Sequence, residues 1–177
     1  MARQIVLLRG INLGATNRIA MAELRELLER DFDDVRTYLQ SGNVVLSSAA
    51  KAKQLGLTCE RLIADRFGLP IKVVVRTRNE LAKVVERNPF GDVAVDPKRY
   101  QVSFLDEKPP AATVEKLAAA AVDGEQLVVI GREAYAWHPN GVARSKLWGE
   151  LAGRGLGVTA TARNWTTVTK LLELADS

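Results

Sequence analysis

The same order of predicted strands and helices occurs twice along this chain of 177 residues. In the first half, short apolar runs predict strands, and apolar residues at helical spacing predict the helices between them. These elements are a strand at 5–8, a helix at 20–30, strands at 35–39 and 44–46, a helix at 52–67 and a strand at 71–75. A further helix begins at Thr77, because Glu80 three residues later completes a capping box.

The second half repeats this order, although few residues are identical between the halves. Its elements are a strand at 100–105, a helix after Pro109-Pro110, strands at 127–130 and 134–137 around a Gly131-Arg132 turn, a helix at 145–151, a strand at 158–161 and a helix capped by Asn164. Each half is typical of a split β-α-β motif. We therefore predict an α+β fold of two tandem ferredoxin-like halves (βαββαβ plus helix) with antiparallel sheets, at 1–90 and 98–177, packed as one compact unit.

Composition excludes several kinds of site. The chain has one cysteine and one histidine, which rules out an intramolecular disulfide, a two-cysteine metal site and a multi-histidine centre. Cys59 falls on the apolar side of a predicted helix and is expected to be buried. No nucleophile elbow, phosphate loop or dinucleotide fingerprint is present. We expect no metal and no cofactor, and no sequence motif indicates a particular reaction.

Charge and hydropathy limit the partners. The net charge is +4 and the isoelectric point is about 9.4, which makes phosphate-bearing partners, including nucleic acid, possible. Nucleic acid is not favoured, because basic and acidic residues are mixed and the first-half strands lack the aromatic residues of an RNA-binding sheet. No signal peptide and no membrane-spanning run are recognisable, so we expect a cytoplasmic protein without a membrane partner. The oligomeric state is left open.

Polar residues gather where the chain leaves its predicted sheets, and we take these loops as candidate binding surfaces. In a ferredoxin-like unit, the loop after the first strand and the turn between the second and third strands lie on one edge. In the first half this edge carries Arg9, Asn12, Asn17, Ser41 and Asn43. Several of these asparagines have an alternative role in turns, because asparagine tolerates left-handed backbone conformations.

A second polar cluster is expected in the second half, at the exits of its third and last strands. Its candidate ligand-binding residues are Lys146, Arg163 and Asn164, with His138 nearby. Asn164 before a helix suits either an anion site or a simple N-cap, and Arg163 suits either an anion or a carboxylate partner within the fold. If the halves pack in opposite orientations, the two clusters form one cleft.

Several segments resemble a known bacterial family. They are residues 7–12, 21–24, 37–45, 88–90 and 161–171, and they occur in order along nearly the whole chain. These segments are similar to the family called domain of unknown function 1697. The resemblance implies a stand-alone bacterial cytoplasmic protein of duplicated α+β architecture, and it implies no activity, substrate or cofactor.

Together these observations predict a small soluble protein that binds a small anionic or nucleotide-like ligand in a polar cleft. Two alternatives stay open. One is an enzyme of unknown reaction that uses the same cleft through electrostatic stabilisation. The other is a protein associated with nucleic acid through its basic charge.

Overall fold

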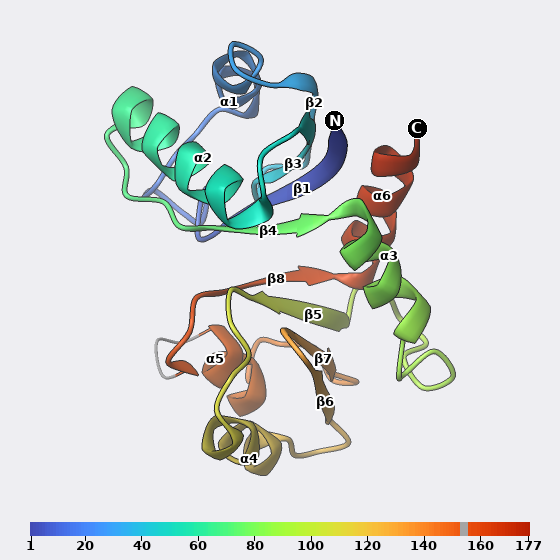
Figure 1. Ribbon diagram of the computed structural model, residues 1–177. Helices are drawn as coiled ribbons and strands as arrows, with labels where there is room; N and C mark the ends of the chain where they lie inside the picture. Colours follow the sequence, from blue (N-terminus) through green and yellow to red (C-terminus); the bar gives the residue numbers. More distant parts are fainter. Residues whose placement is uncertain (153–155) are drawn as a thin grey trace. The chain divides into compact units, whose positions relative to one another are not determined.

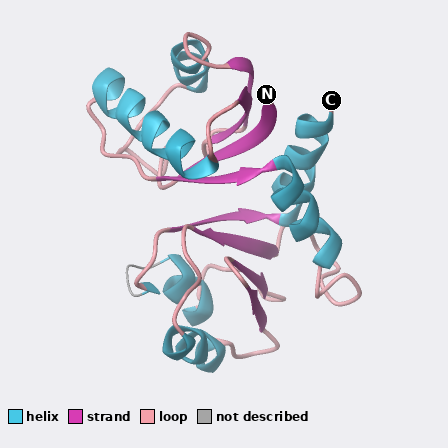
Figure 2. Ribbon diagram, viewed as in Figure 1, coloured by secondary structure: helices cyan, strands magenta, loops and turns pink. Residues whose placement is uncertain are grey.

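The computed structural model describes residues 1–152 and 156–177, and these residues form two four-stranded antiparallel sheets and six α-helices (Figures 1 and 2). The elements follow the order β1 (Ala2–Leu8), α1 (Met21–Leu28), β2 (Asp33–Tyr38), β3 (Asn43–Ser48), α2 (Ala52–Phe67), β4 (Val73–Thr77), α3 (Arg78–Arg87), β5 (Tyr100–Leu105), α4 (Ala111–Ala120), β6 (Gln126–Ile130), β7 (Glu133–Trp137), α5 (Lys146–Ala152), β8 (Ala160–Asn164) and α6 (Trp165–Asp176). The α+β class and the antiparallel sheets are as predicted.

The two sheets have the same strand order. The first runs β2-β3-β1-β4 and the second runs β6-β7-β5-β8, so each strand of one half has a counterpart in the other. The registers correspond as well: Ile5 pairs with Val45 and Arg76, and Val102 pairs with Tyr135 and Arg163. The twofold repetition of element order predicted from the sequence is therefore present in the structure.

The chain divides into two compact units, and each is described separately. The first contains residues 1–83 and 170–177, and the second contains residues 84–169. Both boundaries fall inside helices, one in α3 and one in α6. The division at 1–90 and 98–177 follows the repeat of element order and stays a prediction.

In the first unit, α1 and α2 cover one face of the sheet. Val6 and Leu8 of β1 are fully buried against these helices, together with Leu24 and Ile63. Burying one such side chain contributes about 1.5–3 kcal/mol. Cys59 lies in the same cluster, as predicted, and burial raises the pKa of its thiol to about 12, so it remains a protonated apolar side chain.

In the second unit, α4 and α5 cover one face of the sheet. Ala134 and Ala136 of β7 are buried there beneath Leu117 and Leu147, so small strand residues face large helix residues.

The other face of the second sheet carries an aromatic cluster. Tyr100 stacks on Trp165 with 4.9 Å between ring centroids and meets the ring of Phe90 edge-on. Tyr135 donates a hydrogen bond to the carbonyl oxygen of Val84, a residue of α3 (2.8 Å).

Two strands end later than the hydropathy pattern indicated. β4 spans Val73–Thr77 where 71–75 was expected, and β8 spans Ala160–Asn164 where 158–161 was expected. Each contains an arginine that interrupts the apolar run, yet ladder pairing continues to Gln4↔Thr77 and Gln101↔Asn164. The prediction that Arg163 and Asn164 follow the last strand was therefore wrong, because both belong to it.

The turn of the first hairpin uses left-handed backbone conformations. The turn between β2 and β3 has four residues, 39–42, with Leu39 at φ +56° and Gly42 at φ +90°. A Cβ atom on Gly42 would lie 2.6 Å from Cβ of Leu8, so only glycine fits this close approach. The two-residue turn at Gly131-Arg132 is present as predicted.

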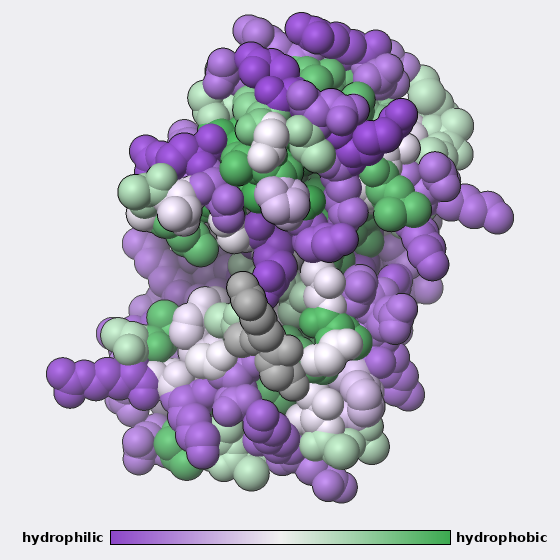
Figure 3. All heavy atoms as spheres, turned by 90° about the vertical axis from the view of Figure 1, so that its left-hand side faces the viewer, coloured by the Kyte–Doolittle hydropathy of each residue, from purple (hydrophilic) through white to green (hydrophobic). Residues whose placement is uncertain are grey.

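No helix among the described residues is long and apolar enough to cross a membrane. The surface seen in Figure 3 is mostly hydrophilic, and its hydrophobic areas are small and separate.

Candidate functional site

A small hollow with a cavity volume of about 110 Å³, open to solvent, lies in the second unit. It forms where the loop before β6 meets the loop after β7, at the edge of the sheet opposite the β6–β7 turn. It is smaller than a typical ligand pocket, but it is concave and several polar groups converge on it, as in ligand sites. Its lining residues are Val122, Asp123, Glu125, Asn140, Gly141, Arg144 and Ser145.

Hydrogen bonds hold both loops in place. The main-chain N–H of His138 bonds to the carbonyl of Arg99 (3.0 Å), which extends the β7 ladder by one residue. The carbonyl of His138 accepts from Gly141 N–H (3.0 Å), and Gly141 adopts φ +80° to close this turn. The side-chain amide of Asn140 donates to the carbonyl oxygen of Asp123 (3.2 Å), which joins the two loops.

Three side chains form a buried polar cluster beneath the hollow. Oε2 of Glu125 accepts from Nδ1 of His138 at 2.6 Å and from Oγ of Ser145 at 2.5 Å. The His138 side chain is fully buried, and that of Glu125 is 7% exposed. Oγ of Ser145 also accepts from the N–H of Trp148 (3.0 Å) and so caps α5. The cluster therefore ties the loop before β6 to the start of α5.

The carboxylate of Glu125 is held in its ionised form. Burial raises its pKa, but the hydrogen bonds donated by Ser145 and His138 lower it more, so the net pKa lies below its usual value. Because Nδ1 of His138 donates to this carboxylate, the imidazole orientation is fixed by Glu125. Nε2 of His138 is buried and has no hydrogen-bond partner within the described part of the chain.

This cluster differs from a serine-histidine-acid triad. In a triad, the acid and the serine contact opposite nitrogens of the imidazole, so that the histidine can take the proton from the serine. Here Glu125 and Ser145 both approach Nδ1 of His138, at 2.6 and 3.3 Å. The hydroxyl of Ser145 also donates its hydrogen bond to the carboxylate of Glu125 and not to the imidazole. The geometry of the cluster therefore suits a role in holding the two loops and their polar side chains in place. It does not suit the activation of Ser145 as a nucleophile.

Arg144 is the cation at the rim of the hollow. Its side chain is exposed, and within 1–152 and 156–177 it makes no hydrogen bond or ion pair. Asp123, an exposed acidic residue, also lines the hollow. The hollow thus offers a guanidinium for an anionic group and carboxylate oxygens for hydroxyl or amino groups.

The three second-half residues predicted from the sequence occupy different surroundings. Lys146 follows Ser145 and is exposed in the first turn of α5. Asn164 caps α6, because its Oδ1 accepts from the N–H of Thr167 (2.9 Å). Arg163 is 7% exposed, and its Nη1 donates to Oγ1 of Thr161 (2.7 Å) and to the carbonyl of Ala162 (2.8 Å). Burial lowers the pKa of Arg163 to about 10.

The first-half loop is tied together by asparagine amides. Nδ2 of Asn12 donates to the carbonyls of Ile19 (2.9 Å) and Gln40 (2.7 Å), so both of its amide hydrogens are used. Oδ1 of Asn12 accepts from the N–H of Ile19 (2.9 Å). Asn17 donates to the carbonyl of Gly10 (3.2 Å). These contacts bring the loop after β1 against the β2–β3 turn, as the predicted topology requires.

The remaining first-half candidates lie at the same edge. Nδ2 of Asn43, which is fully buried, donates to the carbonyl of Tyr38 (2.9 Å) and to Oγ of Ser41 (3.0 Å). Ser41 is exposed, and Arg9 is half-buried at the end of β1. The structure thus groups Arg9, Asn12, Asn17, Ser41 and Asn43 at one edge of the first unit, with three asparagine amides engaged in backbone contacts.

Sequence reasoning missed Glu125 and Arg144, and it also missed Arg76. Glu125 and Arg144 lie in short connecting segments without a motif, so no sequence signal indicated them. Arg76 had a signal: like Arg163, it follows an apolar run and precedes the cap residue of a helix. Arg76 is 1% exposed and donates to the carbonyl of Val75 (3.1 Å), as Arg163 does to Ala162.

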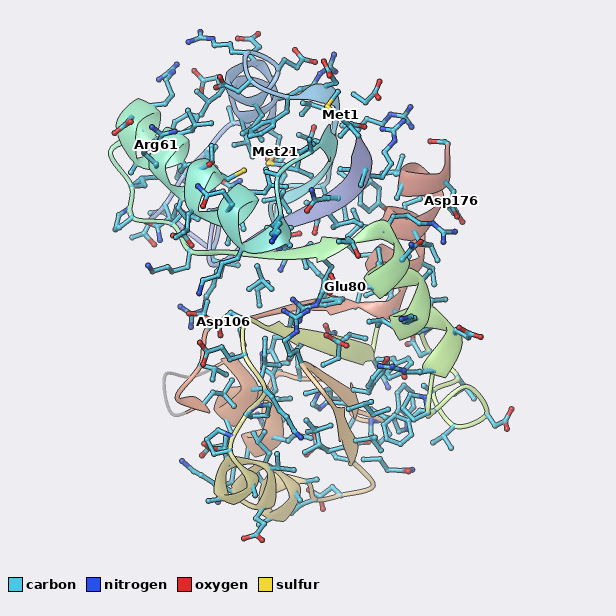
Figure 4. The ribbon with its side chains drawn as sticks, viewed as in Figure 1. Met1, Met21, Arg61, Glu80, Asp106 and Asp176 are labelled. Atoms are coloured by element: carbon cyan, nitrogen blue, oxygen red, sulfur yellow. The ribbon has the colours of Figure 1, made fainter. Side chains whose placement is uncertain are left out.

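The caps that follow these two arginines are also equivalent. Thr77 and Glu80 form the predicted capping box: Oε2 of Glu80 accepts from Thr77 N–H (2.8 Å), and Oγ1 of Thr77 accepts from Glu80 N–H (3.2 Å) (Figure 4). Asn164 performs the same capping at the start of α6. Each half therefore ends its sheet with a buried arginine, a cap residue and a helix.

No group of three or more histidine, cysteine, aspartate or glutamate side chains is placed to hold a metal ion, as far as the described residues extend.

Comparisons with known proteins agree with this architecture. A family model described as "Protein of unknown function (DUF1697)" matches residues 1–135. A solved structure of a conserved bacterial protein from Streptococcus pneumoniae is similar, with a TM-score of 0.73 and 24% sequence identity over 98% of both chains. At this identity the similarity shows the fold alone. No curated protein matches the chain.

Proposed function

The chain belongs to the DUF1697 family, whose function is unknown, and we propose that this protein binds a small anionic or nucleotide-like ligand in the hollow of the second unit. The observation that carries the proposal is Arg144, an exposed guanidinium at the rim of a hollow whose other polar groups are already positioned.

The other groups of the hollow define the ligand chemistry. Arg144 suits a phosphate or carboxylate group, because a guanidinium offers paired donors to such anions. Asp123 and the buried carboxylate of Glu125 suit groups that donate hydrogen bonds, such as sugar hydroxyls or amino groups. A purely anionic ligand would meet repulsion from these two carboxylates. A nucleotide-like molecule, with one anionic end and several hydroxyl or amino donors, fits the whole lining better.

Thermal unfolding in the presence of small probes tests the proposal. Adenosine monophosphate should raise the unfolding temperature, since a ligand that binds only the folded state stabilises it in proportion to its occupancy. Inorganic phosphate should give a smaller shift, and adenosine without phosphate the smallest. Absence of any shift with all three probes would contradict the proposal.

A matched pair of variants locates the effect. Arg144→Ala should abolish the shift caused by adenosine monophosphate while leaving the unfolding temperature of the free protein nearly unchanged. Arg61→Ala removes an exposed arginine from α2 (Figure 4) and should leave the ligand effect intact. An undiminished shift in Arg144→Ala would place the ligand elsewhere.

The same titrations separate the alternatives. Turnover of a stabilising ligand would indicate an enzyme. Binding of single-stranded RNA that weakens steeply with salt and ignores sequence would indicate nucleic-acid association. The ligand-binding roles of Arg9, Asn12, Asn17, Ser41, Asn43, Lys146, Arg163 and Asn164, and their convergence in one cleft, stay predictions.

We also propose that each half is a ferredoxin-like motif, that the two arose by duplication, and that the protein is cytoplasmic. The common strand order supports the first two points, as do the equivalent positions of Arg76 and Arg163. The single buried cysteine supports a reducing compartment.

A further inference from the structure

β6 is an edge strand whose outer side is open. It pairs with β7 and, among the described strands, with no other. The pair closes through the two-residue turn Gly131-Arg132, so Ile130 and Glu133 form a hydrogen-bonded pair next to the turn. Because hydrogen-bonded pairs alternate in an antiparallel ladder, Val128 also bonds toward β7. The N–H and C=O groups of Leu127 and Val129 therefore point outward, away from β7.

The equivalent edge of the first sheet is protected against pairing. β2 begins with Asp33 and Asp34, its register shifts between Asp33 and Arg36, and Asp34 adopts φ +52°. Arg36 occupies the position equivalent to Val128, and its guanidinium bonds to the carbonyl of Leu174 and to Ser177. Charges and bulges of this kind are how edge strands avoid pairing with other chains. β6 has neither: its sequence is Gln-Leu-Val-Val-Ile, without a charge, a proline or a register shift.

The helix beside β6 continues the apolar edge. α4 lies over the β6 side of the sheet, and the side of α4 that faces α5 is marked by Lys116, which pairs with Glu150 of α5 (3.2 Å). At 100° per residue, the side of α4 that points away from α5 carries Val114 and Ala118. Val122, just beyond the helix, is 51% exposed. This strip holds no charge.

We propose that the open edge of β6 binds β6 of a second copy of this chain, forming a twofold-symmetric dimer with one continuous sheet. The pairing is antiparallel, with Val128 opposite Val128 on the symmetry axis and Leu127 opposite Val129. This register matches the outward-pointing backbone groups and uses all five residues of the strand.

The flanks of β6 are complementary in charge in this register. Asp123, which is exposed, precedes the strand, and Arg132 follows it. Antiparallel self-pairing about Val128 sets Gly124 of one copy opposite Arg132 of the other, so Arg132 comes next to the acidic Asp123. A five-residue strand pair alone buries less than the about 1,200 Å² typical of specific interfaces, so the apolar strip of α4 belongs to the interface as well.

Sedimentation velocity of the full chain tests the dimer. The mass obtained for the native chain should be twice the 19.4 kDa of the monomer. Val128→Lys should give the monomer mass, because two lysines would face each other on the symmetry axis. Thr37→Lys adds the same charge to the β2 edge and should remain dimeric. A native chain that is monomeric at its highest soluble concentration would overturn the proposal, as would a dimer unaffected by Val128→Lys.

A covalent readout covers the case in which Val128→Lys fails to fold. Val128→Cys places two thiols across a non-hydrogen-bonded pair, the closest cross-strand position, and Cys59 is buried and does not compete. Mild oxidation should give the covalent dimer rapidly with Val128→Cys and slowly with Thr37→Cys. Equal rates for the two variants would contradict pairing through β6.

Discussion

After their first strands, the two halves make the same main-chain hydrogen bonds but carry side chains of opposite charge. Leu8 N–H bonds to the carbonyl of Gly42 and Leu105 N–H to that of Arg132, both at 2.9 Å. The next residue bonds in both halves to the segment before the last strand: Arg9 N–H to Lys72, and Asp106 N–H to Thr159. The position of Arg9 is thus taken by Asp106 in the second half.

Backbone structure and side-chain chemistry therefore vary independently between the two halves. The strand order, the buried arginine before the last helix and the helix cap occur in both halves. The loops do not correspond: the first half uses asparagine amides to tie one edge, whereas the second half builds the Glu125 cluster and the hollow at the opposite edge of its sheet. Mutation of a feature shared by the halves should therefore cost similar stability in each half. Mutation of a feature found in one half should affect only that half.

The shared arginines should give the largest effect. Arg76→Ala and Arg163→Ala each remove a large buried side chain, and each should lower the free energy of unfolding by roughly 3–5 kcal/mol. The methionine variants, which preserve volume and remove the buried charge, should lose less. Chemical denaturation measures all four. A loss in only one half would break the equivalence of Arg76 and Arg163.

The asparagine network should give the next effect, confined to the first half. Asn12→Ala removes three hydrogen bonds and places alanine at φ +55°, so the free energy of unfolding should fall by about 2–3 kcal/mol. Hydrogen exchange should accelerate at residues 10–19 and 39–42 and stay unchanged in the second sheet. Equal acceleration of hydrogen exchange in both sheets would show that this loop does not unfold independently of the rest of the protein.

The Glu125 cluster should give a pH-dependent effect confined to the second half. The pKa of Glu125 is lower in the folded protein than in the unfolded chain, so its contribution is present above about pH 4.3 and is lost as the pH falls through the folded-state pKa. Glu125→Gln should cost about 1–2 kcal/mol at neutral pH and flatten the acid limb of the stability profile. Glu29→Gln, which removes a charge from an exposed ion pair at the end of α1, is the control. It should change neither the free energy of unfolding at neutral pH nor the acid limb of the stability profile.

The helix caps should give the smallest effect, and it should be equal in the two halves. Thr77→Ala and Asn164→Ala each remove one cap and should each cost about 1 kcal/mol. Thermal unfolding of the two single variants and the double variant checks this. Losses that differ strongly would mean that the capping geometry is shared but its energetic role is not.

Periodicity and capping rules sufficed for the repeated framework, because those signals are local. The helix at 52–67 and the strand at 100–105 have the predicted bounds, and the Thr77–Glu80 capping box formed as expected. The ends of β4 and β8 were placed too early because Arg76 and Arg163 look polar in sequence but are buried in the fold. Whether an arginine is buried depends on tertiary packing, which hydropathy does not report.

The candidate site was less accessible to sequence reasoning. His138 was expected near this edge, and it lies there with Asn140 and Ser145. Glu125 and Arg144 were missed, because their meeting depends on how two short loops fold against each other. Asn12 was predicted as a ligand-binding residue, yet both of its amide hydrogens hold the backbone. The sequence identifies polar loops. The hydrogen bonds of the fold show which of their side chains bond to the protein's own backbone and which are open to a ligand.

The central claim is that a small anionic or nucleotide-like ligand binds the second half at Arg144. Two-dimensional amide NMR during titration with adenosine monophosphate tests it most directly. We expect chemical-shift changes centred on residues 122–125 and 140–145 that vanish in Arg144→Ala. Shifts centred on residues 9–17 and 40–43 of the first half, or no shifts at all, would contradict it.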